Sequence, residues 1–255
     1  MPFTLAHPAA ILPLRRVWRL RTAPLIIGAL IPDLPYYVPG SIGRFLPETH
    51  NLEGSVTVCL ALGYLALLAV FVLRAPLTAL LSARARWLCL TALAPLCRPR
   101  EWLYAGIAIL VGVWTHLLWD SFTHSDTWLV HRVAALSAPV TIGSYNGPLC
   151  HVLQYASSAF GLIVMAVWYF RLRVPPAAPT SPGAVRSSVR PVLLLVSAAA
   201  VLIGGVQALD YYGRQPIVYR TLNIFLTHSL AWFGLLYLLA GSLATLQQQH
   251  EDHGV

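Results

Sequence analysis

The chain has 255 residues, of which 57% are hydrophobic and only 10% charged, and its mean hydropathy is +0.67. This composition excludes an ordinary soluble domain and predicts an integral membrane protein, so the lipid bilayer is the first expected partner. The net charge of +8 comes from arginines that lie in several loops. It therefore indicates membrane topology rather than nucleic-acid binding.

Two short apolar segments precede the first long one. Residues 8–20 predict an amphipathic helix, because Pro8 suits a first helical position and apolar residues recur along the stretch. This helix is too short to span a bilayer. Residues 24–37 are apolar for only about a dozen positions and are closed by prolines, which indicates a buried or re-entrant piece. The flanking prolines predict an extended backbone at Asp33.

Five later segments are long and apolar enough to cross a membrane. They predict helices over about residues 56–73, 102–122, 149–170, 191–209 and 222–246. We therefore expect an all-α fold, an integral membrane bundle of about five spanning helices preceded by short N-terminal helical segments. Residues 1–255 are expected to form one membrane-embedded domain, with a flexible cytoplasmic linker at 174–190 and a solvated tail at 247–255.

The segment at 102–122 ends in three potential metal ligands at four-residue intervals, His116, Asp120 and His124. Steps of four advance a helix by about 400°, so the three side chains drift only about 80° across one face. A carboxylate buried beside two imidazoles costs several kcal/mol unless a cation lies between them, and a divalent metal is the simplest such cation. Hydrogen bonding between helices is the structural alternative.

The arginine distribution predicts which end of the bundle carries these groups. The dense arginine loops at 74–100 and 171–190 are assigned to the cytoplasm, which places His50, the 116–124 stripe and His151 on the opposite side. We therefore expect a multi-pass membrane protein whose site faces the non-cytoplasmic side. The exceptions to the rule in this assignment are Arg44, Arg132, Arg214 and Arg220.

The candidate ligands are imidazoles and carboxylates, with no thiolate among them: His7, Asp33, His50, His116, Asp120 and His124. Such a set suits zinc, and equally suits iron or manganese. Zinc is the metal that we expect. Six ligands exceed what one tetrahedral ion needs. Two metals with Asp120 between them would use the set more fully.

Several motifs together carry a family resemblance, namely those at residues 4–8, 28–37, 49–50, 116–124 and 151–158. The pattern resembles the bacterial domain-of-unknown-function 4184 family over most of the chain, which implies a location in the bacterial cytoplasmic (inner) membrane. The ligand order is more distantly similar to membrane-bound metal-dependent hydrolases and to the zinc-dependent phospholipase C and single-strand nuclease group. That resemblance implies a multi-zinc phosphodiester site on an all-α frame.

Carried over residue by residue, the resemblance implies five metal ligands with Asp120 bridging, namely His7, Asp33, His50, His116 and Asp120. The group's late His-x3-Glu has no match here, because His151 is followed by Gln154 and Tyr155. A third metal is therefore not expected, and Gln154 is expected to orient a substrate or a water instead.

These observations predict a membrane-embedded metal-dependent hydrolase of a phosphoester or another lipid-like or small-molecule substrate. Asp120 or Asp126 would accept the proton, and the residues expected to position the substrate are Tyr145, Asn146, His151 and Gln154. Two alternatives stay open. One is a di-iron membrane oxidoreductase using the same ligands, and the other is a transporter with a metal or proton path through the His and Asp groups.

Overall fold

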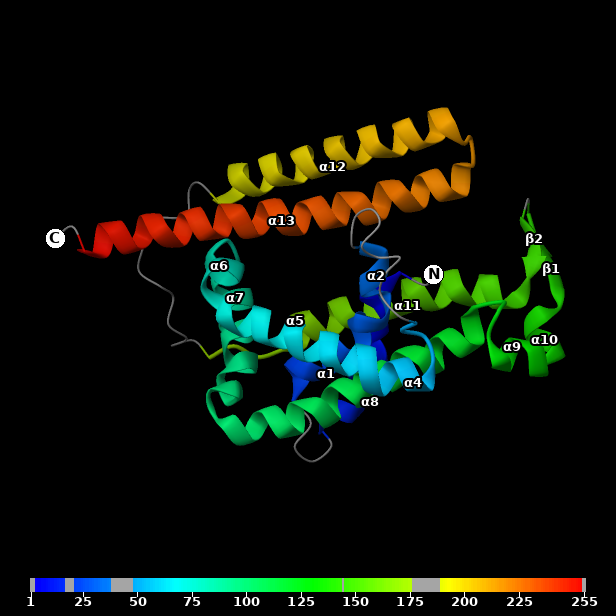
Figure 1. Cartoon of the computed structure of the whole chain (residues 1–255), viewed down its shortest axis with the longest axis horizontal. Coiled ribbons are helices and arrows are strands. Elements are labelled where there is room, and N and C mark those ends of the chain that lie inside the picture. Colours follow the sequence, from blue (N-terminus) through cyan, green and yellow to red (C-terminus); the bar gives the residue numbers. More distant parts are fainter. Residues whose placement is uncertain (1–2, 17–20, 38–47, 144, 176–188, 254–255) are drawn as a thin grey trace. The chain divides into compact units, whose positions relative to one another are not determined.

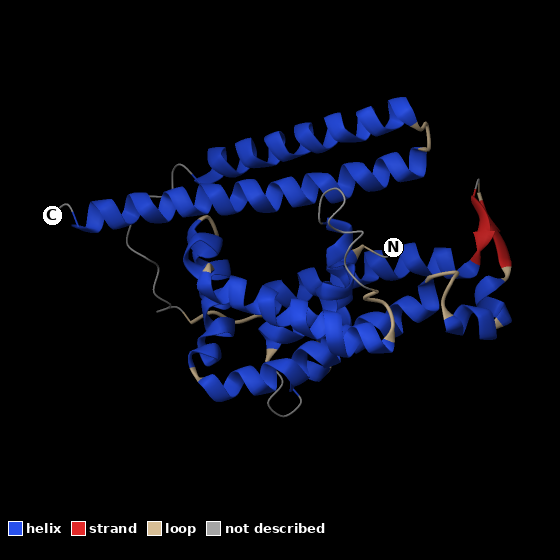
Figure 2. Ribbon diagram, viewed as in Figure 1, coloured by secondary structure: helices blue, strands red, loops and turns tan. Residues whose placement is uncertain are grey.

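The computed structural model describes residues 3–16, 21–37, 48–143, 145–175 and 189–253. Helices make up nearly all of this part of the chain, and a single two-stranded hairpin is the exception within it (Figure 2). Five of its helices are long and apolar enough to cross a membrane. The predicted all-α membrane bundle is confirmed.

The described chain divides into two compact units. Unit 1 comprises Met1–Asp33, Pro47–Leu68 and Pro95–Arg173, and unit 2 comprises Leu34–Leu46, Ala69–Ala94 and Val174–Val255. Each unit is described by itself below. The expectation of a single domain over 1–255 stays a prediction, and most of the expected linker, residues 176–188, lies outside the described residues.

The N-terminal segment of unit 1 differs from the predicted amphipathic helix. It forms a 3-10 helix, η1 (Thr4–Ile11), and a second short 3-10 turn, η2 (Leu14–Arg16), while residues 17–20 lie outside the described part. The prediction of a helix starting at Pro8 was wrong because Pro8 lies inside η1, and prolines lack the N–H that a continuous α-helix needs. The Phe3 amide donates to Ser158 Oγ at 3.0 Å, which ties this segment to the last long helix of the unit.

The next helix, α1 (Thr22–Leu30), crosses the long helix α8 (Pro99–Thr123) at very close range (Figure 1). At nine residues α1 is too short to span a bilayer, as the sequence predicted. A Cβ on Gly28 would overlap the backbone of Ile109, and one on Gly112 would overlap the backbone of Leu25. Glycine at both positions therefore lets the two backbones approach.

The chain then turns through a 3-10 turn, η3 (Ile31–Asp33). The predicted extended backbone at Asp33 was wrong, because the turn continues the helical direction of α1 through Pro32. After residue 47 comes α4 (Leu52–Gly54), where the Asn51 side chain accepts from the Gly54 amide at 2.6 Å and caps the helix. A π-turn, η4 (Ser55–Cys59), leads into α5 (Leu60–Val72).

Helix α8 begins with Pro99 in its first turn and carries buried Glu101 there. Arg21 binds that carboxylate through two nitrogens, with Nε 2.9 Å from Oε2 and Nη2 3.3 Å from Oε1. This hydrogen-bonded pair raises the pKa of Arg21. The pair fixes the start of α1 against the start of α8.

Unit 1 continues through two short helices, α9 (Trp128–Arg132) and α10 (Ala134–Ser137), into an antiparallel hairpin and a second long helix. Strands β1 (Pro139–Ile142) and β2 (Tyr145–Pro148) pair with Val140 opposite Gly147. Helix α11 (Leu149–Arg171) follows directly and ends in an arginine, which is favourable at a helix C-terminus.

Unit 2 is built on two long helices that lie side by side, α12 (Val189–Arg214) and α13 (Val218–His253) (Figure 1). They share a hydrogen-bonded group in which His228 Nδ1 lies 2.8 Å from Gln207 Oε1. The unit also holds α2 (Leu34–Tyr37), α6 (Arg74–Ala79) and α7 (Ala83–Leu93), with the 3-10 turn η5 (Ala94–Cys97) at its border with unit 1. The expected tail at 247–255 is helical as far as His253, and its described side chains are mostly exposed.

All five predicted spans are present, with somewhat wider bounds. The helices suited to cross a membrane are Leu52–Val72, Pro99–Thr123, Leu149–Arg171, Val189–Arg214 and Arg220–Glu251. The residues by which these helices exceed the predicted spans lie at the helix ends and are mostly polar or arginine. A prediction from hydropathy alone leaves such residues out.

Candidate metal centre

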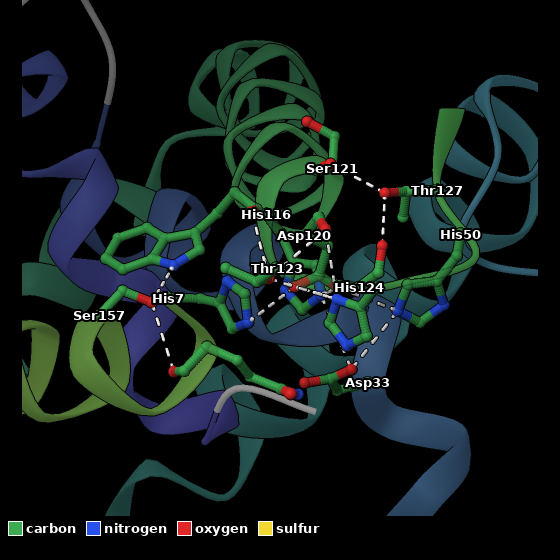
Figure 3. A network of polar contacts seen from close by, with 12 residues as sticks. His7, Asp33, His50, His116, Asp120, Ser121, Thr123, His124, Thr127 and Ser157 are labelled. Carbon is green, nitrogen blue, oxygen red and sulfur yellow. Dashed lines mark hydrogen bonds and ion pairs between the residues drawn. The ribbon is translucent and has the colours of Figure 1, made fainter. Parts of the chain in front are cut away.

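Unit 1 brings six predicted ligands into one group at the end of α8 (Figure 3). His7 comes from η1, Asp33 from η3 and His50 from the turn before α4, while His116 and Asp120 come from successive turns of α8. His7, Asp33 and His116 are almost fully buried. Segments far apart in the sequence therefore deliver imidazoles and carboxylates to one place.

Four of these residues are close enough to hold one metal ion. One ligand atom from each of Asp33, His50, His116 and Asp120 lies within 4.8 Å of all the others. Asp33 Oδ1 lies 3.4 Å from His50 Nε2 and 3.6 Å from His116 Nε2. Asp120 Oδ2 lies 3.7 Å and 3.1 Å from the same two nitrogens. We call these four residues the inner cluster.

The orientation of His116 is set by a backbone carbonyl. Its Nδ1 lies 2.8 Å from the carbonyl oxygen of Ala29, so Nδ1 carries a hydrogen and donates it. In the neutral ring Nε2 is then a bare lone pair facing two carboxylates. Nε2 and Asp120 Oδ2 are close but are not aligned as a hydrogen bond. Two acceptors facing each other favour a cation between them.

His50 is oriented in the same way by a hydroxyl. The Thr49 hydroxyl donates to the carbonyl of Pro32 at 2.8 Å, and its oxygen lies 3.1 Å from His50 Nδ1. Because that single hydroxyl hydrogen is already used, Thr49 Oγ1 accepts from Nδ1–H of the neutral ring. Nε2 is then the coordinating nitrogen and faces Asp33 and Asp120. Such outer hydrogen bonds are what fix metal-binding histidines.

The second oxygen of Asp120 faces two further histidines. Oδ1 lies 3.5 Å from His7 Nε2 and 3.5 Å from His124 Nδ1. The His7 ring stacks on His116 with centroids 3.7 Å apart and meets Trp119 edge-on. Helix α8 ends at Thr123, so His124 is its C-cap in extended backbone rather than a third member of a helical stripe.

Burial sets the protonation of the groups that lie outside the five long helices. Desolvation by burial lowers the pKa of His7 to about 4, so His7 is neutral and can coordinate at neutral pH. Burial also lowers the pKa of His124, against the opposing pull of Asp120. Burial raises the pKa of Asp33, but its contacts with His50, with His116 and with the Thr4 hydroxyl outweigh burial and leave that pKa below its usual range.

The donor set fits a divalent metal. Four buried polar atoms of the group have no hydrogen-bond partner among the described residues: His7 Nδ1, His7 Nε2, His116 Nε2 and Asp120 Oδ1. Unpartnered polar atoms at this depth are costly, and several of them converge on carboxylates. A cation bound among these atoms would satisfy Asp120 Oδ1 and the nitrogens that carry a lone pair, whereas hydrogen bonding among the described residues leaves them unpaired.

Other predicted site residues lie outside this group. Asp126 is exposed in the turn between α8 and α9, where its charge acts on His124. Tyr145 and Asn146 lie on β2, and the Tyr145 hydroxyl donates to the carbonyl of Pro148. No contact described for the hairpin joins it to the six ligands.

The two predicted residues of α11 lie in its first turns. His151 is half-buried, and no contact described for it reaches the ligands. Gln154 is buried, and its carbonyl accepts from the hydroxyl of Ser157, which in turn accepts from Trp119 Nε1 at 3.0 Å. Ser157 and Trp119 therefore link the Gln154 backbone carbonyl to the neighbourhood of His7. A substrate-positioning role for these residues stays a prediction.

The supporting residues were not predicted from the sequence. Thr4 donates to Asp33 Oδ2 at 2.5 Å, Thr49 orients His50, and Trp119 borders His7. One signal was available, because four of the nine histidines directly follow a threonine: His50, His116, His124 and His228. At His50 and His124 the preceding hydroxyl does lie next to the ring nitrogen.

The comparisons with known proteins identify a family and no activity. The model of the family described as "Domain of unknown function (DUF4184)" matches residues 1–246. No curated protein and no solved structure matches the chain significantly. The matched range holds all six ligands and all five long helices almost to their ends. The chain therefore belongs to the domain-of-unknown-function family DUF4184.

Proposed function

We propose that this chain is a membrane-embedded, metal-dependent hydrolase that acts on a phosphoester or another lipid-like substrate at the non-cytoplasmic surface. The observation that carries the proposal is the inner cluster, in which His116 Nε2 and His50 Nε2 present lone pairs to Asp33 and Asp120. Imidazole and carboxylate ligands without thiolate suit zinc, and also iron or manganese.

The two oxygens of Asp120 support a site for two ions. Oδ2 faces the nitrogens of His50 and His116, and Oδ1 faces those of His7 and His124. His124 Nδ1 lies 3.3 Å from the Asp120 carbonyl and so donates its hydrogen there, which leaves His7 Nε2 as the nitrogen ligand on the Oδ1 side. A carboxylate with nitrogen ligands on both sides is suited to bridge. A divalent cation in such a site lowers the pKa of a bound water towards neutrality and withdraws charge from a scissile oxygen.

Charge balance favours an anionic substrate. With its histidines neutral, the group carries two negative charges, one each from Asp33 and Asp120. One divalent ion would neutralise this charge, and two would leave an excess of two positive charges in a buried region. A phosphoester is the substrate class that such an excess attracts.

The residues at the rim take the remaining roles in this proposal. Asp126 is exposed beside His124, so it can exchange protons with solvent without being a ligand. Asp120 is the alternative proton acceptor. Tyr145, Asn146, His151 and Gln154 remain proposed substrate contacts.

Elemental analysis of the full-length protein in detergent tests the proposal, combined with hydrolysis assays on phosphomonoester, phosphodiester and carboxylic ester substrates. We expect at least one divalent ion per chain, lost in Asp120→Ala and kept in Asp210→Ala. Asp210 is the matched control because it is an exposed carboxylate paired with Arg214 on α12. Hydrolysis should disappear with the metal and return when the stripped wild type is reloaded.

Two results would overturn the proposal in different ways. Metal at background level in the wild type would exclude the metal centre. Bound metal without hydrolysis of any ester class would exclude the hydrolase, and redox-active iron as that metal would favour the oxidoreductase alternative.

A further inference from the structure

A groove in unit 1 lies beside the metal centre but shares none of its ligands. It has a volume of about 570 Å³ and is formed by η1, η2, α8 and α11. This size is within the range of small-molecule sites. Most of its lining is apolar and includes Phe160 and Val164, whereas Arg15 and Arg16 supply two positive charges.

The polar groups of the groove gather at one end. The Arg15 guanidinium lies over the ring of Trp168, 5.8 Å from its centroid. Trp168 Nε1 is buried and has no hydrogen-bond partner among the described residues. No carboxylate of the described chain pairs with Arg15 or Arg16, although arginine favours anionic oxygens as partners. Two arginines without a carboxylate partner among the described residues therefore line an apolar groove, with Arg15 over the Trp168 ring.

The length of the groove suits one membrane leaflet. Trp119 lines its other end and is held there by Ser157 of α11. From Ser157 to Trp168 the helix rises about 16 Å. One leaflet of a hydrocarbon core is about 15 Å thick. Both long helices of the groove, α8 and α11, are apolar enough to cross a membrane.

We propose that this groove binds one anionic phospholipid, with its phosphate on Arg15 and Arg16 and an acyl chain along Phe160 and Val164 toward Trp119. Charge complementarity selects an anionic headgroup, and the apolar lining selects a lipid over a free phosphate ion. The site goes beyond the proposed hydrolase and does not need the metal, because its lining residues are not ligands.

Quenching of tryptophan fluorescence by phosphatidylglycerol with brominated acyl chains tests the site, using the full-length protein in detergent micelles. We expect saturable quenching in the wild type, about tenfold or more weaker binding in the double variant Arg15→Gln/Arg16→Gln, and wild-type binding in Arg98→Gln/Arg132→Gln. The second pair removes the same charge from exposed arginines outside the groove lining. Brominated phosphatidylcholine should bind more weakly than phosphatidylglycerol.

A second variant tests the apolar part separately. Val164→Phe fills the groove without changing its charge and adds no tryptophan to the fluorescence signal, so it should abolish saturable quenching while helical circular dichroism stays that of the wild type. Asp120→Ala should bind the lipid normally, which separates this site from the metal centre. Equal binding by Arg15→Gln/Arg16→Gln and its control would overturn the proposal. Competition by inorganic phosphate at concentrations matching the lipid would also overturn it, in favour of a phosphate site.

Discussion

At the scale of single residues, the charge of Asp120 separates a metal site from a hydrogen-bonded helix contact. If metal is bound, Asp120→Asn removes the charge that offsets the cation, so metal occupancy should fall by at least tenfold and hydrolysis with it. If Asp120 only forms hydrogen bonds between helices, Asp120→Asn should change the stability of the protein little or raise it slightly, because a buried charge disappears. Thermal unfolding with and without a chelator measures the difference.

The metal site and the hydrogen-bonded helix contact predict opposite changes in thermal stability for Asp120→Asn. A chelator should lower the Tm of the wild type and leave that of Asp120→Asn unchanged. A wild type that is indifferent to chelator, and no more stable than the variant, would contradict the metal site.

The hydroxyl behind His50 provides a test that removes no ligand. Thr49→Val keeps the shape of the side chain but removes both the acceptor for His50 Nδ1 and the donor to the Pro32 carbonyl. Metal affinity should fall about 10- to 100-fold, as is usual when such outer hydrogen bonds are lost. Competition with a chromophoric chelator measures it. Thr49→Ser keeps the hydroxyl and should bind like the wild type, so equal affinities in both variants would contradict this role.

The residue pattern predicted the local part of the site better than the distant part. His116 and Asp120 are one helical turn apart, so their spacing alone places them together. In the structure His116 Nε2 lies 3.1 Å from Asp120 Oδ2. His7, Asp33 and His50 reach the same place through tertiary packing, which spacing does not encode. Residue chemistry named them as candidates, and the arginine distribution placed only His50 at the same end as His116 and Asp120. The Ala29 carbonyl that orients His116 is backbone, so no side-chain pattern can indicate it.

At the scale of elements, the crossing of α1 and α8 holds the two halves of the inner cluster together. Gly112 precedes His116 by one turn, and a Cβ there would overlap the Leu25 backbone. Gly112→Ala should therefore destabilise the protein by about 1–3 kcal/mol, as overpacking usually does, and should also weaken metal binding by shifting His116. Chemical unfolding and metal titration in detergent measure the two effects.

A second glycine supplies the control for that prediction. A Cβ at Gly234 in α13 meets nothing within 4 Å, so Gly234→Ala should be neutral or stabilising by up to about 1 kcal/mol, because alanine favours helix. If the two substitutions had equal effects, close backbone approach at Gly112 would not be what holds the crossing.

The long helices were predicted correctly because their hydropathy determines them, whereas the proline-containing N-terminal segment was not. Long apolar runs such as 149–170 and 191–209 became helices with nearly the predicted bounds, because a bilayer-length apolar segment has few alternatives. The N-terminal segment is shorter and amphipathic, Pro8 lies within it, and it forms a 3-10 helix. The 3-10 form at η1 and η3 is what places His7 and Asp33, so the error fell on the part of the fold nearest the site.

At the scale of the whole molecule, the arginine distribution predicts the side of the membrane on which the centre lies. Arg84 and Arg173 belong to the arginine-rich segments and should face the cytoplasm. Glu53, close to His50, and Asp126, close to His124, should then face outside, because one long helix separates each from an arginine-rich segment.

Reporter fusions made after these positions test the assignment with the chain in its own membrane. An alkaline phosphatase reporter should be active after Glu53, Asp126 and Arg214 and inactive after Arg84 and Arg173, and a fluorescent reporter that folds only in the cytoplasm should give the reverse pattern. The two reporters control each other, since a misfolded fusion is silent in both. A cytoplasmic signal after Asp126 would mean that the bundle has the opposite orientation in the membrane. The metal centre would then open to the cytosol, and the proposed hydrolase would draw its substrate from the inner leaflet.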